Sequence, residues 1–184
     1  MLKILATICI IGMATSSCTS KKASRTESSH EAEPELTMIV GTYTSGDSKG
    51  LYSFRFNEEN GTATALSEAE VENPSYLVPS ADGKFIYAVS EFSNDQAAAN
   101  AFAFNKEEGT FRLLNTQKTE GEDPCYIITN GSNVITANYS GGSISVFPID
   151  KGGSLVPASE VVKFRGSGAA KARQEKPHLQ CVRI

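Results

Sequence analysis

The sequence is poor in the residues that build metal sites and disulfide scaffolds. After residue 36 it holds two cysteines, Cys125 and Cys181, and one histidine, His178, and no CxxC pair occurs. Because zinc sites need clustered cysteine and histidine ligands, we expect neither a metal nor a cofactor. Export would permit a disulfide between Cys125 and Cys181, but two buried free thiols are favoured in so cysteine-poor a domain.

Dense positive charge and helical periodicity are also lacking. The formal net charge is −4, and no basic stretch follows residue 36. Nucleic-acid binding depends on clustered Lys and Arg, so we exclude nucleic acid as a partner. The alanine-rich segment 94–102 could pass for a helical turn, but it lies between two strand-like runs and is predicted to be a connection within a blade.

Long apolar runs are absent as well. The run near the N-terminus, Ile4 to Met13, is too short to cross a bilayer. It follows Lys3 and precedes small residues, which is the layout of a secretory signal. Residues 15–18, Thr-Ser-Ser-Cys, resemble the lipobox of bacterial lipoproteins, so we predict a lipoprotein signal over 1–18 with acylation of Cys18. An ordinary cleaved signal with an incidental cysteine is the alternative.

The residues after Cys18 are polar and rich in serine. Residues 19–35 include no aromatic or branched aliphatic side chain, so they cannot bury enough apolar surface to offset the entropy of ordering. We predict a disordered tether over 19–36 and a folded domain over 37–184. The lipid anchor would place the protein at the bacterial cell envelope, in the periplasm or at the outer membrane.

The folded part repeats itself with a period near 50 residues. FNEENGTATAL at 56–66 recurs as FNKEEGTFRLL at 104–114, and a shorter copy begins at Ile149. Each copy follows an apolar run and places a glycine where a hairpin turn needs positive φ. A second motif recurs in step with the first, and its prolines are Pro74, Pro124 and Pro177.

Short strands, frequent turns and this period are typical of a β-propeller with four antiparallel strands in each blade. We therefore predict an all-β propeller. The 148 residues from 37 to 184 allow about three blades, with the first strand of a fourth beginning at Leu179. Because a propeller needs about four to eight blades to close a ring, we expect the sequence to be the N-terminal part of a longer propeller.

Several segments resemble the lactonase family of seven-bladed propellers, in the family's order. They are GTYTSGDSKGLYSFRF, NPSYLVPSADGKFIYAVSE, GEDPCYI, ANYSGGSISVFPID and RQEKPH. The family includes bacterial 6-phosphogluconolactonases, with fungal carboxymuconate cyclases as relatives. The resemblance runs from Met38 to Ile184 and implies about three of seven blades. It also implies hydrolysis of a sugar lactone, such as 6-phosphogluconolactone to 6-phosphogluconate, or of a related lactone. A non-catalytic envelope propeller that binds a ligand or a protein is the alternative.

In that family, the segment resembling RQEKPH lies near the central channel. Opening a lactone needs an activated water, a stabilised oxyanion and, for a phosphorylated substrate, a cationic clamp. His178 or Glu175 could act as general base, while Arg173 could bind a phosphate or carboxylate or stabilise the oxyanion. On an extended segment Arg173 and Glu175 would point the same way. We include Gln174 among the substrate-binding candidates.

Three further substrate-binding candidates end equivalent strand runs, where propeller channels gather polar groups: Glu91, Asn138 and Tyr139. A purely structural role is the alternative for the C-terminal cluster. In that case Arg173 and Glu175 form an ion pair at a blade junction, and His178 packs under a proline-led turn. The family pattern continues as Pro-His-x-His, whereas Gln180 takes the place of the second histidine. If that histidine is required, activity or substrate choice is altered.

Overall fold

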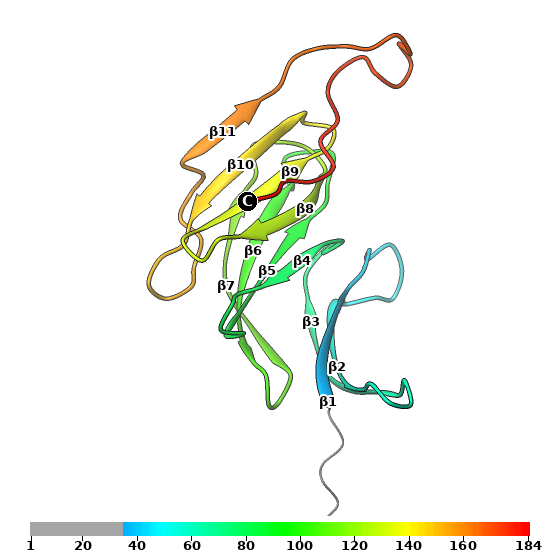
Figure 1. Ribbon diagram of the computed structural model, residues 1–184, viewed down its shortest axis with the longest axis vertical. Coiled ribbons are helices and arrows are strands. Elements are labelled where there is room, and N and C mark those ends of the chain that lie inside the picture. Colours follow the sequence, from blue (N-terminus) through cyan, green and yellow to red (C-terminus); the bar gives the residue numbers. More distant parts are fainter. Residues whose placement is uncertain (1–34) are drawn as a thin grey trace, which may run out of the picture. The chain divides into compact units, whose positions relative to one another are not determined.

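The computed structural model describes residues 35–184, which form three successive antiparallel sheets (Figure 1). This described part contains no helix, and hence none long and apolar enough to cross a membrane. The predicted signal, Cys18 and nearly all of the predicted tether lie outside the described residues. Those assignments therefore stay predictions of the sequence.

Within each sheet, strands that follow one another in the chain are neighbours. The first sheet contains β1 (Glu35–Gly41), β2 (Gly50–Asn57) and β3 (Ala63–Glu70). The second contains β4 (Leu77–Pro79), β5 (Phe85–Ser90), β6 (Ala98–Asn105) and β7 (Thr110–Lys118). The third contains β8 (Pro124–Thr129), β9 (Asn133–Asn138), β10 (Ser143–Pro148) and β11 (Glu160–Lys163). The predicted blades are confirmed, with three strands described in the first and four in each of the others.

The repeated segments form the same turn in each blade. A side-chain oxygen at the start of the turn accepts backbone N–H groups two to four residues later, and the acceptors are Asn57, Asn105 and Asp150. A glycine at positive φ completes each turn, namely Gly61 (72°), Gly109 (72°) and Gly153 (86°). The repeat therefore encodes turn chemistry, because Asn and Asp can bond to nearby backbone N–H groups and glycine tolerates positive φ.

The second sheet is buried on both faces, because it has a sheet on each side. Alternate residues of β5 point to opposite faces. Ile86 and Ala88 pack toward the first sheet, with Leu51 of β2. Tyr87 and Val89 join the core that the third sheet completes; its members there include Ile127, Val134 and Phe147. This double burial explains why β5 reads as a continuous apolar run instead of an alternating one.

Two of the repeated turns dock on the preceding blade. Ser53 Oγ in β2 donates a hydrogen bond of 2.6 Å to the carbonyl of Gly109. The hydroxyl of Tyr87 in β5 donates one of 3.2 Å to the carbonyl of Gly153, and burial raises the pKa of Tyr87 to about 12. A side chain at Gly153 would lie 2.2 Å from the ring of Phe85, whereas one at Gly61 would meet nothing within 4 Å.

We expect Gly153→Ala to destabilise the domain by about 3 kcal/mol, against about 1 kcal/mol for Gly61→Ala. Both variants place an L-residue at positive φ, which costs about 1 kcal/mol. Gly153→Ala adds an overlap with the Phe85 ring, worth about 2 kcal/mol more. Urea-unfolding midpoints measure the difference, and equal losses in the two variants would show that the third blade does not dock on Phe85.

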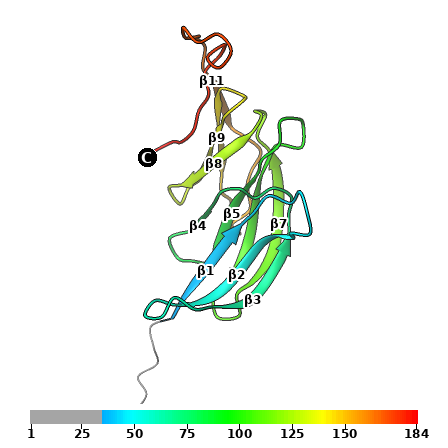
Figure 2. The same cartoon turned by 90° about the vertical axis from the view of Figure 1, so that its right-hand side faces the viewer.

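Two local expectations are corrected. Part of segment 94–102 belongs to β6, which begins at Ala98, because its apolar side chains pack between sheets. The strand expected from Leu179 does not form, since none of the described strands pairs with residues 179–184. Instead the chain after β11 extends as a loop and turns back toward β8 (Figures 1 and 2).

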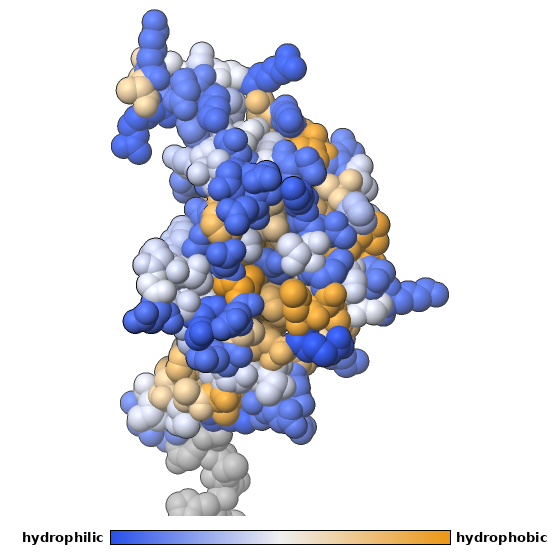
Figure 3. Space-filling view, turned by 180° about the vertical axis from the view of Figure 1, so that it is seen from behind, coloured by the Kyte–Doolittle hydropathy of each residue, from blue (hydrophilic) through white to orange (hydrophobic). Residues whose placement is uncertain are grey.

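The surface seen from behind is largely polar, with several separate apolar patches (Figure 3). Large apolar side chains that stay exposed include Leu36, Leu113, Val156 and Phe164. Exposed apolar side chains at single positions are ordinary on folded proteins, so these residues give no functional information by themselves.

Candidate functional site

The returning C-terminal loop and Tyr139, which directly follows β9, line an open hollow of about 660 Å³. Its lining includes the side chains of Tyr139, Arg173, Gln174, Lys176, His178 and Gln180. A glycine-rich stretch, 166–168, forms part of the same wall. Four of the predicted site residues, Tyr139, Arg173, Gln174 and His178, therefore meet in one cavity.

His178 is fixed by its ring and its backbone. The imidazole stacks on the phenol ring of Tyr139, with ring centroids 4.6 Å apart and planes at 30°. Tyr139 directly follows β9, and its N–H donates to the carbonyl of Asp123 over 2.8 Å. The carbonyl of Pro177 lies against Gly142, where a side chain would come within 2.8 Å of it. The tight β9–β10 turn thus lets the loop approach the third blade closely.

The two ring nitrogens of His178 have different surroundings. Nε2 lies 3.3 Å from Oε1 of Glu175, while Nδ1 is buried and has no hydrogen-bond partner. Burying an unpaired N–H costs more than burying an unpaired lone pair of this kind, so we assign the proton of the neutral ring to Nε2. His178 then donates to the Glu175 carboxylate.

Glu175 offers the accessible base of this pair. Its side chain is 52% exposed. The pKa of Glu175 is lowered, chiefly by a hydrogen bond from its own backbone N–H; partial burial opposes this, and His178 adds a smaller lowering. The carboxylate is therefore ionised near neutral pH and can accept a proton from water.

Arg173 and Gln174 belong to a turn, not to an extended segment. The N–H groups of both donate to the carbonyl of Ala170, over 2.9 and 2.8 Å. Gln174 also closes the loop, because its side-chain Oε1 accepts from Ala170 N–H and its carbonyl accepts from Gly168 N–H. The expectation that Arg173 and Glu175 lie side by side on an extended segment is thus incorrect. Glu175 faces His178 instead.

The two remaining candidates lie elsewhere. Glu91 follows β5 and accepts hydrogen bonds from Tyr43 and Ser75, outside the hollow. Asn138 is fully buried inside the third blade, and its amide bonds to Thr136, Ser143 and Ser145. Its side chain therefore does not reach the hollow. Glu91 and Asn138 come from equivalent strands as expected, because β5 and β9 are each the second strand of their sheet in chain order.

Sequence reasoning did not single out Lys176, Tyr43 or Ser75. The repeat contained a signal for Ser75, because the residue after each repeated proline is Ser75, Cys125 or His178. Both folded-domain cysteines are free, as predicted, but only Cys125 is even partly buried, and Cys181 is exposed. Burial, then the nearby charge of Glu91, raises the pKa of the Cys125 thiol, so this thiol is a poor nucleophile at neutral pH.

The chain is similar to proteins named as lactone hydrolases. A 6-phosphogluconolactonase of Bacillus subtilis (strain 168) is 37% identical over 145 residues, which cover 76% of this chain and 40% of that protein. A 6-phosphogluconolactonase of Formosa agariphila is 33% identical over 149 residues, covering 77% of this chain and 42% of that protein. The chain thus spans about two fifths of the length of these relatives.

Solved structures agree with these sequence matches. A Bacteroides fragilis protein, provisionally named a 6-phosphogluconolactonase, matches with a TM-score of 0.80 and 70% identity over 82% of this chain and 42% of its own. The periplasmic gluconolactonase PpgL of Pseudomonas aeruginosa matches with a TM-score of 0.66 and 28% identity, over 72% of this chain and 39% of its own. The family described as "Lactonase, 7-bladed beta-propeller" matches residues 37–184. By this match and the propeller blades that carry it, the chain belongs to the seven-bladed lactonase family.

Proposed function

We propose that the protein hydrolyses a sugar lactone, with 6-phosphogluconolactone or a related lactone as substrate. The observation that carries this proposal is a hollow lined by Arg173 and His178, with the Glu175 carboxylate 3.3 Å from the His178 ring. The names of the relatives support the choice of reaction. Because the chain spans only part of the length of these relatives, their names do not by themselves assign the activity to it.

The residues of the hollow, together with Glu175 beside His178, supply the parts that ring opening needs. Glu175 takes a proton from water, and the water oxygen attacks the lactone carbonyl carbon. Arg173 stabilises the oxyanion that forms, because its guanidinium carries a fixed charge and several donors. When the ring C–O bond breaks, the departing alkoxide takes the proton back from Glu175, and a carboxylic acid and a hydroxyl result. The acid then releases its own proton to solvent and becomes a carboxylate. His178 holds Glu175 in place and stabilises its charge.

Lys176 and Arg173 also give the hollow its positive charge, which suits a phosphate or carboxylate on the substrate. Tyr139 and Gln174 complete the proposed binding wall. Glu91, which does not line the hollow, stays a proposed substrate-binding residue.

The experiment is a continuous assay of lactone ring opening by the full-length protein, comparing Arg173→Ala with Lys171→Ala. We expect Arg173→Ala to lower kcat/KM by at least about tenfold, since a charge-assisted hydrogen bond is worth about 1.5–3 kcal/mol. Lys171 lies two residues away but does not line the hollow, so its variant should stay within about twofold.

Equal activity in the two variants would remove Arg173 from the site. Absence of any lactone hydrolysis by the wild-type protein would overturn the proposed function and favour a non-catalytic binding propeller.

A further inference from the structure

A second polar group joins the first and second blades. Glu91 Oε2 accepts a 2.9 Å hydrogen bond from the hydroxyl of Tyr43 and a second one from Ser75 Oγ. Tyr43 comes from the β1–β2 loop, and Ser75 precedes β4. Both donors meet the same oxygen. Among the described residues, none donates a hydrogen bond to Oε1, and Glu91 is only half-buried.

The backbone around this carboxylate is held on both sides. Glu91 N–H donates to the carbonyl of Asn73 over 3.0 Å, and the Asn73 side chain donates back to the carbonyl of Glu91 over 3.3 Å. Asn73 Oδ1 also accepts from Thr44 N–H over 3.0 Å, which ties down the loop that carries Tyr43. The free oxygen is therefore presented in a fixed direction.

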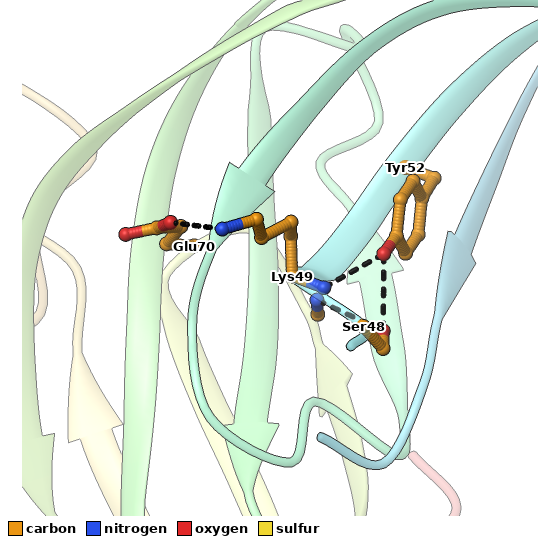
Figure 4. A network of polar contacts seen from close by, with 5 residues as sticks. Ser48, Lys49, Tyr52 and Glu70 are labelled. Carbon is orange, nitrogen blue, oxygen red and sulfur yellow. Dashed lines mark hydrogen bonds and ion pairs between the residues drawn. The ribbon is translucent and has the colours of Figure 1, made fainter. Parts of the chain in front are cut away.

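The far end of the Tyr43 loop is ordered by a separate network (Figure 4). The hydroxyl of Tyr52 lies 2.7 Å from Lys49 N and 3.1 Å from Ser48 Oγ, and Lys49 Nζ pairs with Glu70 at 2.8 Å. Ser48 Oγ also hydrogen-bonds to Thr42 Oγ1, next to Tyr43. The loop is thus preorganised, although Tyr43 itself is 58% exposed.

Cys125 lies between this group and the segment that follows His178. The Cys125 thiol lies 3.5 Å from the carbonyl of Leu179, the residue after His178, and the charge of Glu91 acts on that thiol. Tyr76, which follows Ser75, is 41% exposed and packs on the ring of Tyr126 with centroids 4.6 Å apart. The contacts of Tyr76 with Tyr126 thus join the segment after Ser75 to the third blade.

We propose that Glu91, held by Tyr43 and Ser75, is a hydroxyl-binding subsite that recognises the polyhydroxy part of the substrate. A carboxylate with one oxygen held by protein donors and the other free is suited to accept hydrogen bonds from sugar hydroxyls. The choice of a sugar derivative rests on the proposed function. The subsite itself is a binding feature and does not depend on turnover.

A brace between two blades would account for the hydrogen bonds to Oε2 alone. It does not account for the free Oε1 or for a Tyr43 that is more than half exposed while donating to a carboxylate. Exposed aromatic side chains with one polar end are common in recognition surfaces. The arrangement therefore fits a ligand contact better than a buried strut.

The test compares two probes that differ in their hydroxyls, D-gluconate and hexanoate, by NMR titration of the full-length protein. Glu91→Gln is expected to weaken D-gluconate binding about tenfold, because hydrogen bonds to a charged acceptor are lost. Tyr43→Phe should act in the same direction by about threefold. The matched control Tyr87→Phe removes a core hydroxyl that bonds to Gly153, so it should leave D-gluconate binding unchanged. Hexanoate carries the same charge, so it reports any electrostatic effect of Glu91→Gln.

The inference is overturned if Glu91→Gln and Tyr43→Phe leave D-gluconate binding unchanged, or if hexanoate is affected as strongly. Melting temperatures of the variants check folding, and Tyr43→Phe keeps the test decisive if Glu91→Gln folds poorly. D-gluconate binding that depends on Glu91, without any lactone hydrolysis, would support the subsite and overturn the proposed reaction. Lactone hydrolysis together with D-gluconate binding that does not depend on Glu91 would support the proposed reaction and overturn the subsite.

Discussion

Glu175→Gln should lower the kcat of lactone hydrolysis by about a hundredfold or more while KM changes little. The substitution keeps the size of the side chain and its hydrogen bond with His178, but it removes the group that takes the proton from water. General-base catalysis contributes about 10²–10⁴-fold, and the loss falls on kcat because the interaction matters in the transition state. The measurement is steady-state kinetics at saturating lactone.

Glu107→Gln is the matched control, since Glu107 lies on the exposed β6–β7 turn and should retain wild-type kcat.

His178→Phe tests whether His178 positions Glu175 or only packs on Tyr139. Phenylalanine keeps a ring against Tyr139 but loses the hydrogen-bond donor to Glu175. The active form of Glu175 is the carboxylate, so activity falls as pH drops through its pKa. Removing His178 removes part of what lowers that pKa, and the acid limb of kcat should move to higher pH. An unmoved acid limb would leave His178 a purely structural role.

Asn138→Ala should cost about 3 kcal/mol of unfolding free energy. Asn138 is fully buried, and its amide makes three hydrogen bonds of 2.9 to 3.0 Å with the side chains of Thr136, Ser143 and Ser145. Each buried hydrogen bond contributes about 1 kcal/mol, and the hydroxyls left behind lose their partner. Chemical denaturation monitored by circular dichroism measures the loss.

Asn130→Ala is the matched control, because Asn130 is exposed and its side chain caps a turn through the N–H groups of Ser132 and Asn133. We expect it to cost about 1 kcal/mol. If Asn138→Ala were as stable as Asn130→Ala yet bound the lactone poorly, Asn138 would act in binding and not in the blade core.

The all-β propeller was predictable because its signals are local. Turn residues such as Asn57 and Gly61 recur at Asn105 and Gly109, and a turn of this kind depends on side-chain bonds to the nearest backbone groups and on positive φ. The period of the repeat then sets the size of a blade. These features need no knowledge of distant contacts, so the sequence alone was sufficient to predict them.

For the candidate site, too, the sequence predicted the features that depend on neighbouring residues and missed those that depend on folding. The sequence predicted that Arg173, Gln174, Glu175 and His178 belong together, because they are close in the chain and resemble a family segment. It predicted the wrong geometry for Arg173, since the hydrogen bonds to Ala170 turn the chain there. It could not distinguish Asn138, whose side chain is buried in the blade, from the adjacent Tyr139, which lines the hollow.

By itself the sequence determined the blade repeat, the turns and the identity of the ionisable groups near the C-terminus. The tertiary structure alone decided which of those groups meet. Side chains of consecutive strand residues point to opposite faces, so the third blade buries Asn138 while Tyr139, just past the strand, stacks on His178. Likewise Tyr43, Ser75 and Glu91 come from three separate segments, and only the docking of one blade against the next brings their oxygens together.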